Sequence, residues 1–140
     1  MFNQRYLDYW LLVFRIAIAV FMMNHGYAKL TKLIDGDLSF ANPIGVGETA
    51  SLILVVFSEF FCSLFIGLGA LTRLASIPLI ITMAVAAFIT HGGDPFAKKE
   101  MALVYLLIYI TILILGPGKY SIDWARMTMK KDDGNDGVKG

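Results

Sequence analysis

Four ionisable residues lie inside long apolar runs of this sequence, and they are the positions at which chemistry is expected. Arg15, His25 and Lys29 belong to the first run, and Glu59 belongs to the second. An ionisable side chain within a membrane-spanning helix is costly, so it faces the bundle interior and marks a candidate functional site. A carboxylate beside such bases can transfer protons, while the bases can bind an anion or a carbonyl group.

Helical spacing places the three bases close to one face of the first run. At 100° per residue, Arg15 and Lys29 fall within a stripe about 40° wide, and His25 lies beside Lys29. Glu59 lies near the middle of its own run. The spacing predicts a polar chain of Arg15, Glu59, His25 and Lys29 that opens outwards from mid-membrane. Glu59 and His25 are the candidate catalytic groups, and Arg15 and Lys29 the candidate substrate-binding groups.

Each of these residues also has a simpler structural interpretation. Lys29 lies near a helix end, from which its ammonium group can reach the lipid headgroups. Arg15 and Glu59 can form an ion pair that only sets the register of two helices. His25 can be an ordinary hydrogen-bonded imidazole. Glu59 is the hardest to explain structurally, because it lies far from both ends of its run.

Two further candidate substrate-binding groups, His91 and Glu100, lie between the third and fourth apolar runs. The segment His91-Gly92-Gly93-Asp94 also fits an ordinary turn. His25 and His91 raise the possibility of a bis-histidine haem, but their expected depths match poorly. The sequence has no HxxxH or ExxH spacing, so we predict no metal site. It also indicates no intrinsic cofactor.

Single residues outside these clusters add two observations. Tyr105 and Tyr109, one helical turn apart, either pack in the core or line a pocket. Cys62 is the one cysteine of the chain, and this argues against an enzyme of thiol–disulfide exchange.

The elements that must position these residues are four apolar segments, at about residues 10–30, 49–71, 74–90 and 101–115. The chain of 140 residues is 57% hydrophobic, whereas soluble domains have about 45–50% apolar residues. Helices are the natural form for apolar segments of this length, because lipid offers the backbone no hydrogen-bond partners. We therefore predict an all-α, four-helix transmembrane bundle in residues 1–124. A polar, glycine-containing tail at 125–140 is expected to be disordered.

The distribution of basic residues predicts the orientation of the bundle. With four spans, the N-terminus, the 72–73 connection and the C-terminus share one side. That side carries more uncompensated basic residues than the other, so both termini are predicted to be cytoplasmic. The net charge of only +1 gives no basic surface for nucleic acid.

Several motifs together resemble the DoxX family. They are Arg15 followed by Asn24-His25-Gly26-Tyr27-Ala28-Lys29-Leu30, then Glu59 in the second apolar run. Gly67-Leu68-Gly69-Ala70-Leu71-Thr72-Arg73 closes that run, and Gly116-Pro117-Gly118-Lys119-Tyr120-Ser121-Ile122-Asp123 follows the fourth. The order and spacing of these motifs carry the resemblance over about residues 10–124.

The resemblance implies a four-helix, multi-pass protein of the bacterial inner membrane. Relatives of this kind include the small membrane subunit of a thiosulfate:quinone oxidoreductase and proteins associated with resistance to oxidative or quinone stress. The leading hypothesis is therefore a membrane component of a redox system that handles a quinone or a small sulfur compound.

The partners expected on this hypothesis are the lipid bilayer, a quinone or small anion, and a partner protein or a second copy of the chain. The sequence shows no electron carrier, so whether the chain is itself an enzyme stays open. Two alternatives also stay open. One is a non-enzymatic membrane anchor or assembly subunit, and the other is a small transporter that uses the polar chain as its pathway.

Overall fold

The computed structural model describes residues 3–136, which contain helices and no strand, so the all-α class is confirmed. The elements in chain order are α1 (Gln4–Ile34), α2 (Glu48–Val56), η1 (Phe57–Cys62), α3 (Ser63–Leu68), α4 (Thr72–Val85), η2 (Ala86–Thr90), α5 (Phe96–Leu115) and α6 (Ile122–Asp136). The two η elements are short π-helices that continue the α-helices before them. The chain thus forms four long helical segments, followed by α6.

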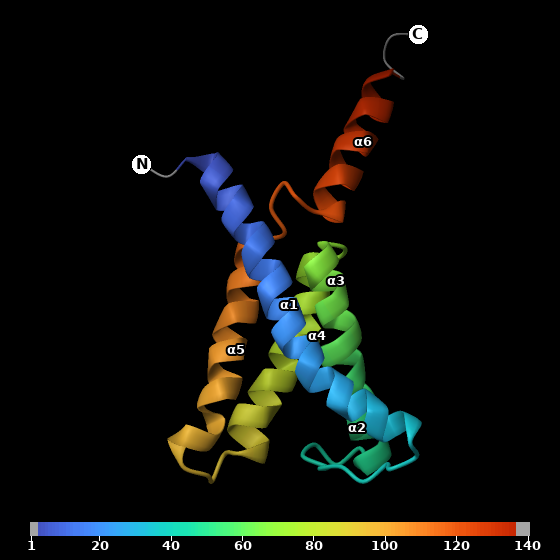
Figure 1. Ribbon diagram of the computed structural model, residues 1–140, viewed down its shortest axis with the longest axis vertical. Coiled ribbons are helices and arrows are strands. Elements are labelled where there is room, and N and C mark those ends of the chain that lie inside the picture. Colours follow the sequence, from blue (N-terminus) through green and yellow to red (C-terminus); the bar gives the residue numbers. More distant parts are fainter. Residues whose placement is uncertain (1–2, 137–140) are drawn as a thin grey trace.

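The four segments form a bundle in which α1 crosses diagonally over the others (Figure 1). α1 packs on α2, η1 and α3, while α5 packs along α4. Consecutive segments run in opposite directions. One end of the bundle, here called the terminal end, therefore holds the start of α1, the turn at 69–71 and the segment 116–121. The other, the loop end, holds the loops at 35–47 and 91–95.

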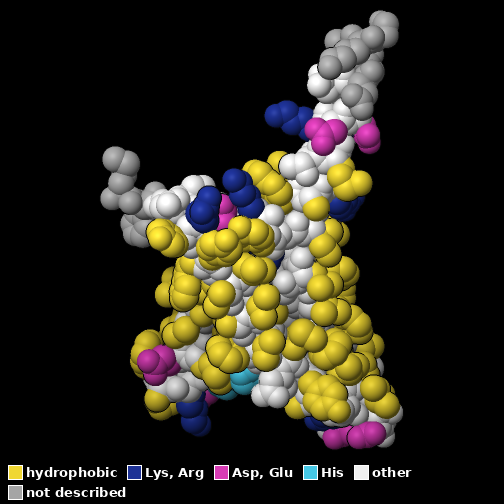
Figure 2. Space-filling view, turned by 45° about the horizontal axis from the view of Figure 1, so that its top comes forward, with side chains coloured by type: hydrophobic (Ala, Val, Ile, Leu, Met, Phe, Trp, Pro, Cys, Tyr) yellow, Lys and Arg dark blue, Asp and Glu magenta, His cyan; other side chains and the backbone are white. Residues whose placement is uncertain are grey.

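Three of the segments are long and apolar enough to cross a membrane, namely Gln4–Ile34, Glu48–Leu68 and Thr72–Thr90. α5 has 20 residues, but its first turns carry Lys98, Lys99 and Glu100. Hydrophobic side chains cover the middle of the bundle, and charged side chains gather towards its two ends (Figure 2). This distribution is typical of a protein whose surface faces lipid. Crossing of the bilayer by α5 stays a prediction.

The core is narrow and lies where the four segments meet. Its buried side chains come from α1, η1, α3, α4 and α5, and they include Ile18, Met22, Cys62, Ile66, Leu79, Met83, Tyr109 and Ile112. Most other apolar side chains are exposed on the outside of the bundle. Because the core is thin, the buried polar groups described below contribute strongly to the packing and register of the helices.

The C-terminal segment differs from the disordered tail that its composition predicts, because residues 125–136 belong to helix α6. Asp123 in the first turn favours a helix N-terminus, and alanine, methionine, lysine and arginine in the following turns are good helix formers. α6 projects away from the bundle at the terminal end (Figure 1). Residues 137–140 of the predicted tail lie outside the described residues.

Candidate functional site

An ion pair between Lys29 of α1 and Glu59 of η1 is the centre of the candidate site. Lys29 Nζ lies 2.5 Å from Glu59 Oε2. The side chain of Glu59 is only 7% exposed, whereas that of Lys29 is 29% exposed. The carboxylate is therefore buried between the helices. The ammonium group of Lys29 lies between this carboxylate and the solvent at the loop end. Two of the four residues of the predicted polar chain are thus in direct contact.

Gly26 allows the two helices to approach closely enough for this pair. It lies almost one turn before Lys29 on α1 and is buried. A Cβ atom at Gly26 would lie 2.8 Å from the backbone carbon of Glu59 and 2.8 Å from the backbone nitrogen of Phe60. Only glycine fits this contact. This role does not follow from helical spacing alone, although a glycine between His25 and Lys29 is a usable sequence signal for it.

The local conformation around Glu59 is also unusual. Glu59 lies within the π-helical turn Phe57–Cys62, which interrupts an otherwise α-helical segment. Such turns shift the following side chains around the helix and occur frequently at functional sites. Ser58, its neighbour in the turn, is within hydrogen-bond distance of Thr82 of α4 at 2.8 Å. The π-turn therefore faces α1 with Glu59 and α4 with Ser58.

His25 lies beside a pair of tyrosines on α5. Its ring meets the ring of Tyr105 edge to face, with centroids 5.9 Å apart, and Tyr105 in turn stacks on Tyr109 at 6.2 Å. Glu59 is tied to the same region through its partner Lys29, which lies one helical turn after His25 on α1. Among the described residues, the buried hydroxyl groups of Tyr109 and Ser63 have no hydrogen-bond partner. Polar groups from α1, η1, α3 and α5 therefore converge here.

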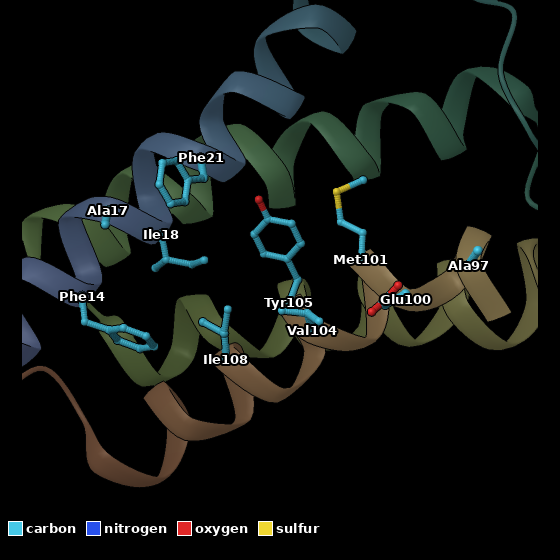
Figure 3. A pocket seen from close by; sticks show the side chains of 10 residues that line it. All are labelled: Phe14, Ala17, Ile18, Phe21, Ala97, Glu100, Met101, Val104, Tyr105 and Ile108. Carbon is cyan, nitrogen blue, oxygen red and sulfur yellow. The ribbon is translucent and has the colours of Figure 1, made fainter.

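An apolar cavity of about 560 Å³ lies between α1 and α5 next to these groups. Figure 3 shows side chains of α1 facing Tyr105 and Ile108 of α5, with Glu100 nearer the start of α5. The lining residues are Phe14, Ala17, Ile18, Phe21, Ala97, Glu100, Met101, Val104, Tyr105 and Ile108. A second cavity of about 430 Å³ shares Phe21 and Tyr105 with the first and adds Val20, Asn24 and His25.

The two cavities together form a groove, here called the α1–α5 groove, with a volume in the range of small-molecule sites. Its walls are apolar, and its polar groups are confined to Asn24, His25, Tyr105 and Glu100. It lies within the hydrophobic part of the surface, where an apolar ligand could enter from lipid. Of the two roles that the sequence allows for Tyr105, core packing or lining a pocket, the structure places its side chain in the wall of this groove.

Arg15, the fourth member of the predicted polar chain, does not contact Glu59. It is 1% exposed, and its Nη2 donates a hydrogen bond of 2.7 Å to the carbonyl of Tyr120. Arg15 and Lys29 are separated by 14 positions, or about 21 Å along a helix, and Glu59 lies level with Lys29. The predicted chain is therefore divided into two separate sites. The alternative interpretation, an Arg15–Glu59 ion pair that sets helix register, is also wrong, because Glu59 pairs with Lys29.

Arg15 belongs instead to a group of interactions at the terminal end, here called the clasp. The clasp consists of Arg15, Gly69, Leu71, Thr72, Tyr120, Ser121 and Asp123. The Asp123 carboxylate accepts hydrogen bonds from the backbone N–H groups of Leu71 at 2.7 Å and Thr72 at 2.9 Å, and so caps α4. The N–H group of Asp123 donates to the carbonyl of Gly69 at 2.9 Å. Two sequence motifs about 50 residues apart thus meet around one buried arginine.

The Asp123 cap makes the stability of the clasp dependent on pH. Burial raises the pKa of Asp123, but the hydrogen bonds from Thr72 and Leu71 outweigh this and hold the pKa below its ordinary value. A carboxyl group with a lowered pKa in the folded state stabilises that state above its unfolded pKa of about 3.9. The contribution is lost as the pH falls through the lower, folded-state pKa.

We therefore expect Asp123→Ala to destabilise the protein above about pH 4, by about 1 kcal/mol as for other helix caps. The difference from the wild type should shrink at lower pH. Unfolding in detergent, followed by circular dichroism from pH 7 to pH 2, measures it. Asp132→Ala, at an exposed position of α6, is the control and should show no such profile. A difference for Asp123→Ala that stays constant down to pH 2 would contradict the assignment.

His91 and Glu100 lie at the loop end. His91 Nδ1 is within hydrogen-bond distance of the Asp94 carboxylate at 2.9 Å, and Lys99 donates to the carbonyl of Gly92 at 3.1 Å. The hydrogen bond from His91 is the largest cause of the lowered pKa of Asp94, and the charges of Lys98 and Lys99 lower it further. The His91–Asp94 and Lys99–Gly92 contacts fit the turn interpretation of this segment. Glu100, by contrast, lines the α1–α5 groove.

Comparison with known proteins agrees with the motifs. The DoxX family model matches residues 10–92, which contain Arg15, the Lys29–Glu59 pair and the turn at Gly69. An uncharacterised protein of Haemophilus influenzae is 28% identical over 127 residues, covering 86% of this chain and 92% of the relative. No solved structure matches the chain. The family model covers more than half of the chain, and we conclude that this protein belongs to the DoxX family of membrane proteins.

Proposed function

We propose that this protein binds a quinone in the α1–α5 groove and acts as a membrane component of a quinone-linked redox system. The observation that carries the proposal is the apolar groove with His25 and Tyr105 at one part of its wall. The buried Glu59 carboxylate pairs with Lys29, one helical turn after His25 on α1. A quinone has a flat apolar ring and two carbonyl oxygens. It therefore requires apolar walls together with a small number of hydrogen-bond donors.

The groove offers both kinds of contact. Phe14, Ile18 and Phe21 of α1 form one wall for the ring. The His25 imidazole, the Tyr105 hydroxyl and the Asn24 amide are donors available to a quinone carbonyl. His25 thereby donates a hydrogen bond to the carbonyl that is reduced. Glu100 borders the part of the groove nearest the loop end.

Glu59 and Lys29 supply the proton chemistry of the proposal. Reduction of a quinone to a quinol takes up two electrons and two protons. A buried carboxylate can pass protons, and the partly exposed Lys29 beside it connects Glu59 to the water at the loop end. The electrons come from a partner protein or a bound cofactor. Arg15 serves the fold through the clasp, and not the ligand.

The proposed setting is the bacterial inner membrane, crossed four times, with both termini in the cytoplasm. Antiparallel segments support this topology, because the start of α1 and the end of α5 lie at the same end of the bundle. Arg5, Arg73 and Lys119 lie at that end, as expected for a cytoplasmic side. The 20 residues of α5 are enough to span the hydrocarbon core.

Filling the groove tests this function. Ala17→Trp places an indole among the lining residues and is expected to weaken binding of a short-chain quinone at least about tenfold, as a steric block of the site. The control is Ile16→Trp on the same helix, which is exposed and does not line the groove. Binding is measured by quenching of tryptophan fluorescence in lipid nanodiscs, with folding checked by circular dichroism. Equal quinone affinity for both variants and the wild type would refute binding in this groove.

A further inference from the structure

A second pocket, separate from the α1–α5 groove, opens at the terminal end of the bundle. It has a volume of about 650 Å³ and lies between the start of α1, the start of α4 and the segment that joins α5 to α6. Its walls combine apolar side chains, among them Leu7, Leu74 and Leu115, with charged side chains. The charged residues are Asp8, Arg73, Lys119 and Asp123, and the Asp123 carboxylate already accepts the hydrogen bonds that cap α4. A pocket with this composition, placed where the helices leave the apolar belt, is at the level of lipid headgroups.

Asp8 is the unusual member of this pocket. It is only 4% exposed, yet within residues 3–136 it forms no ion pair, and its one hydrogen bond comes from the Gln4 amide at 3.4 Å. A buried carboxylate without a cationic partner is costly. Because Asp8 lines the pocket, a positively charged N–H donor in the pocket would satisfy it.

Two cations of the same pocket are held in place without a carboxylate. Arg73 reaches the carbonyl of Ile114 at 3.4 Å, and its guanidinium group lies against Gly116. Lys119 lies over the ring of Trp124, with its ammonium nitrogen 5.9 Å from the ring centroid. Both side chains are exposed and keep N–H groups available for an anion.

We propose that this pocket binds a phospholipid with a phosphoethanolamine headgroup. The primary ammonium group pairs with Asp8, the phosphate pairs with Arg73 and Lys119, and the acyl chains follow the leucines along α1 and α4. The Asp123 carboxylate of this pocket is already engaged by the backbone N–H groups of Leu71 and Thr72. The remaining charges, the buried Asp8 carboxylate and two cations, match a zwitterion. A headgroup with a quaternary amine carries the same charge but has no N–H group to donate to Asp8.

Lipids with identical acyl chains test the proposal in full-length protein purified in detergent. Phosphatidylethanolamine, phosphatidylcholine and phosphatidylglycerol are titrated separately, and binding is counted by native mass spectrometry. We expect phosphatidylethanolamine to bind about tenfold more tightly than phosphatidylcholine, the difference expected from one charged hydrogen bond. Asp8→Asn should remove this preference, whereas Asp132→Asn on α6 should keep it.

A second variant distinguishes loss of one headgroup contact from a general change in folding. Arg73→Gln should weaken phosphatidylethanolamine and phosphatidylcholine equally, because it acts on the phosphate that both lipids share. Equal binding of these two lipids by the wild type would overturn the proposal, as would tighter binding of phosphatidylglycerol. Soluble phosphoethanolamine that competes as well as the lipid would indicate a free phosphate ester as the ligand, and would also overturn it.

Discussion

Replacement of Gly69 by alanine is expected to reduce the free energy of unfolding by about 3–5 kcal/mol, the range for loss of a buried charge's partners. Gly69 has a φ of +72°, which an alanine adopts only with strain. Its Cβ would lie 2.1 Å from Arg15 Nη1 and 2.4 Å from Ser121 Cβ. Arg15 would have to leave its buried position and lose its hydrogen bond to Tyr120. Thermal and denaturant unfolding in detergent, followed by circular dichroism, measures the change.

The matched control for this variant is Gly45→Ala. Gly45 has nearly the same φ, +75°, but no atom lies within 4 Å of a Cβ built there. It therefore reports the backbone strain alone, which is about 1 kcal/mol. The remaining difference between the two variants belongs to the packing around Arg15. Similar losses of stability in both would show that the clasp does not depend on close contact at Gly69.

Lys29→Met is expected to have the second large effect, a loss of about 3–5 kcal/mol, because it leaves the Glu59 carboxylate buried without its cation. Glu59→Met should be less harmful, since the partly exposed Lys29 can reach water. The double variant Lys29→Met/Glu59→Met removes both charges and should recover most of the stability. Unfolding of the four proteins in detergent gives the interaction energy by a double-mutant cycle.

The pair Lys32–Asp37 on the exposed loop side is the control for this cycle. Its charged atoms are 3.8 Å apart, and both side chains reach solvent. Lys32→Met should therefore cost less than about 1 kcal/mol. If the losses of the Lys29 and Glu59 variants simply add in the double variant, the ion pair does not stabilise the contact between α1 and η1. The proton pathway proposed through Glu59 would then lose its structural basis.

Much of the helical architecture follows from local properties of the chain. The predicted segments at 10–30, 49–71, 74–90 and 101–115 each fall within or closely match a helical segment of the structure. An apolar run of sufficient length becomes a helix wherever it lies, because each backbone group bonds to a neighbour four residues away. The prediction of a disordered tail at 125–140 was less accurate. Residues 125–136 belong to α6, where helix propensity outweighed overall polarity.

The sequence by itself determined the helical class, the positions of the apolar segments and the identity of the charged residues that must be sheltered from lipid. Only the tertiary structure decided which of those charges meet. The contact at Gly26 sets Glu59 opposite Lys29. In the clasp, Arg15 lies against Gly69 and bonds to the Tyr120 carbonyl instead of Glu59. The physical reason is that spacing gives the depth of a residue along its own helix, whereas the register between two helices depends on close contacts between residues far apart in the chain.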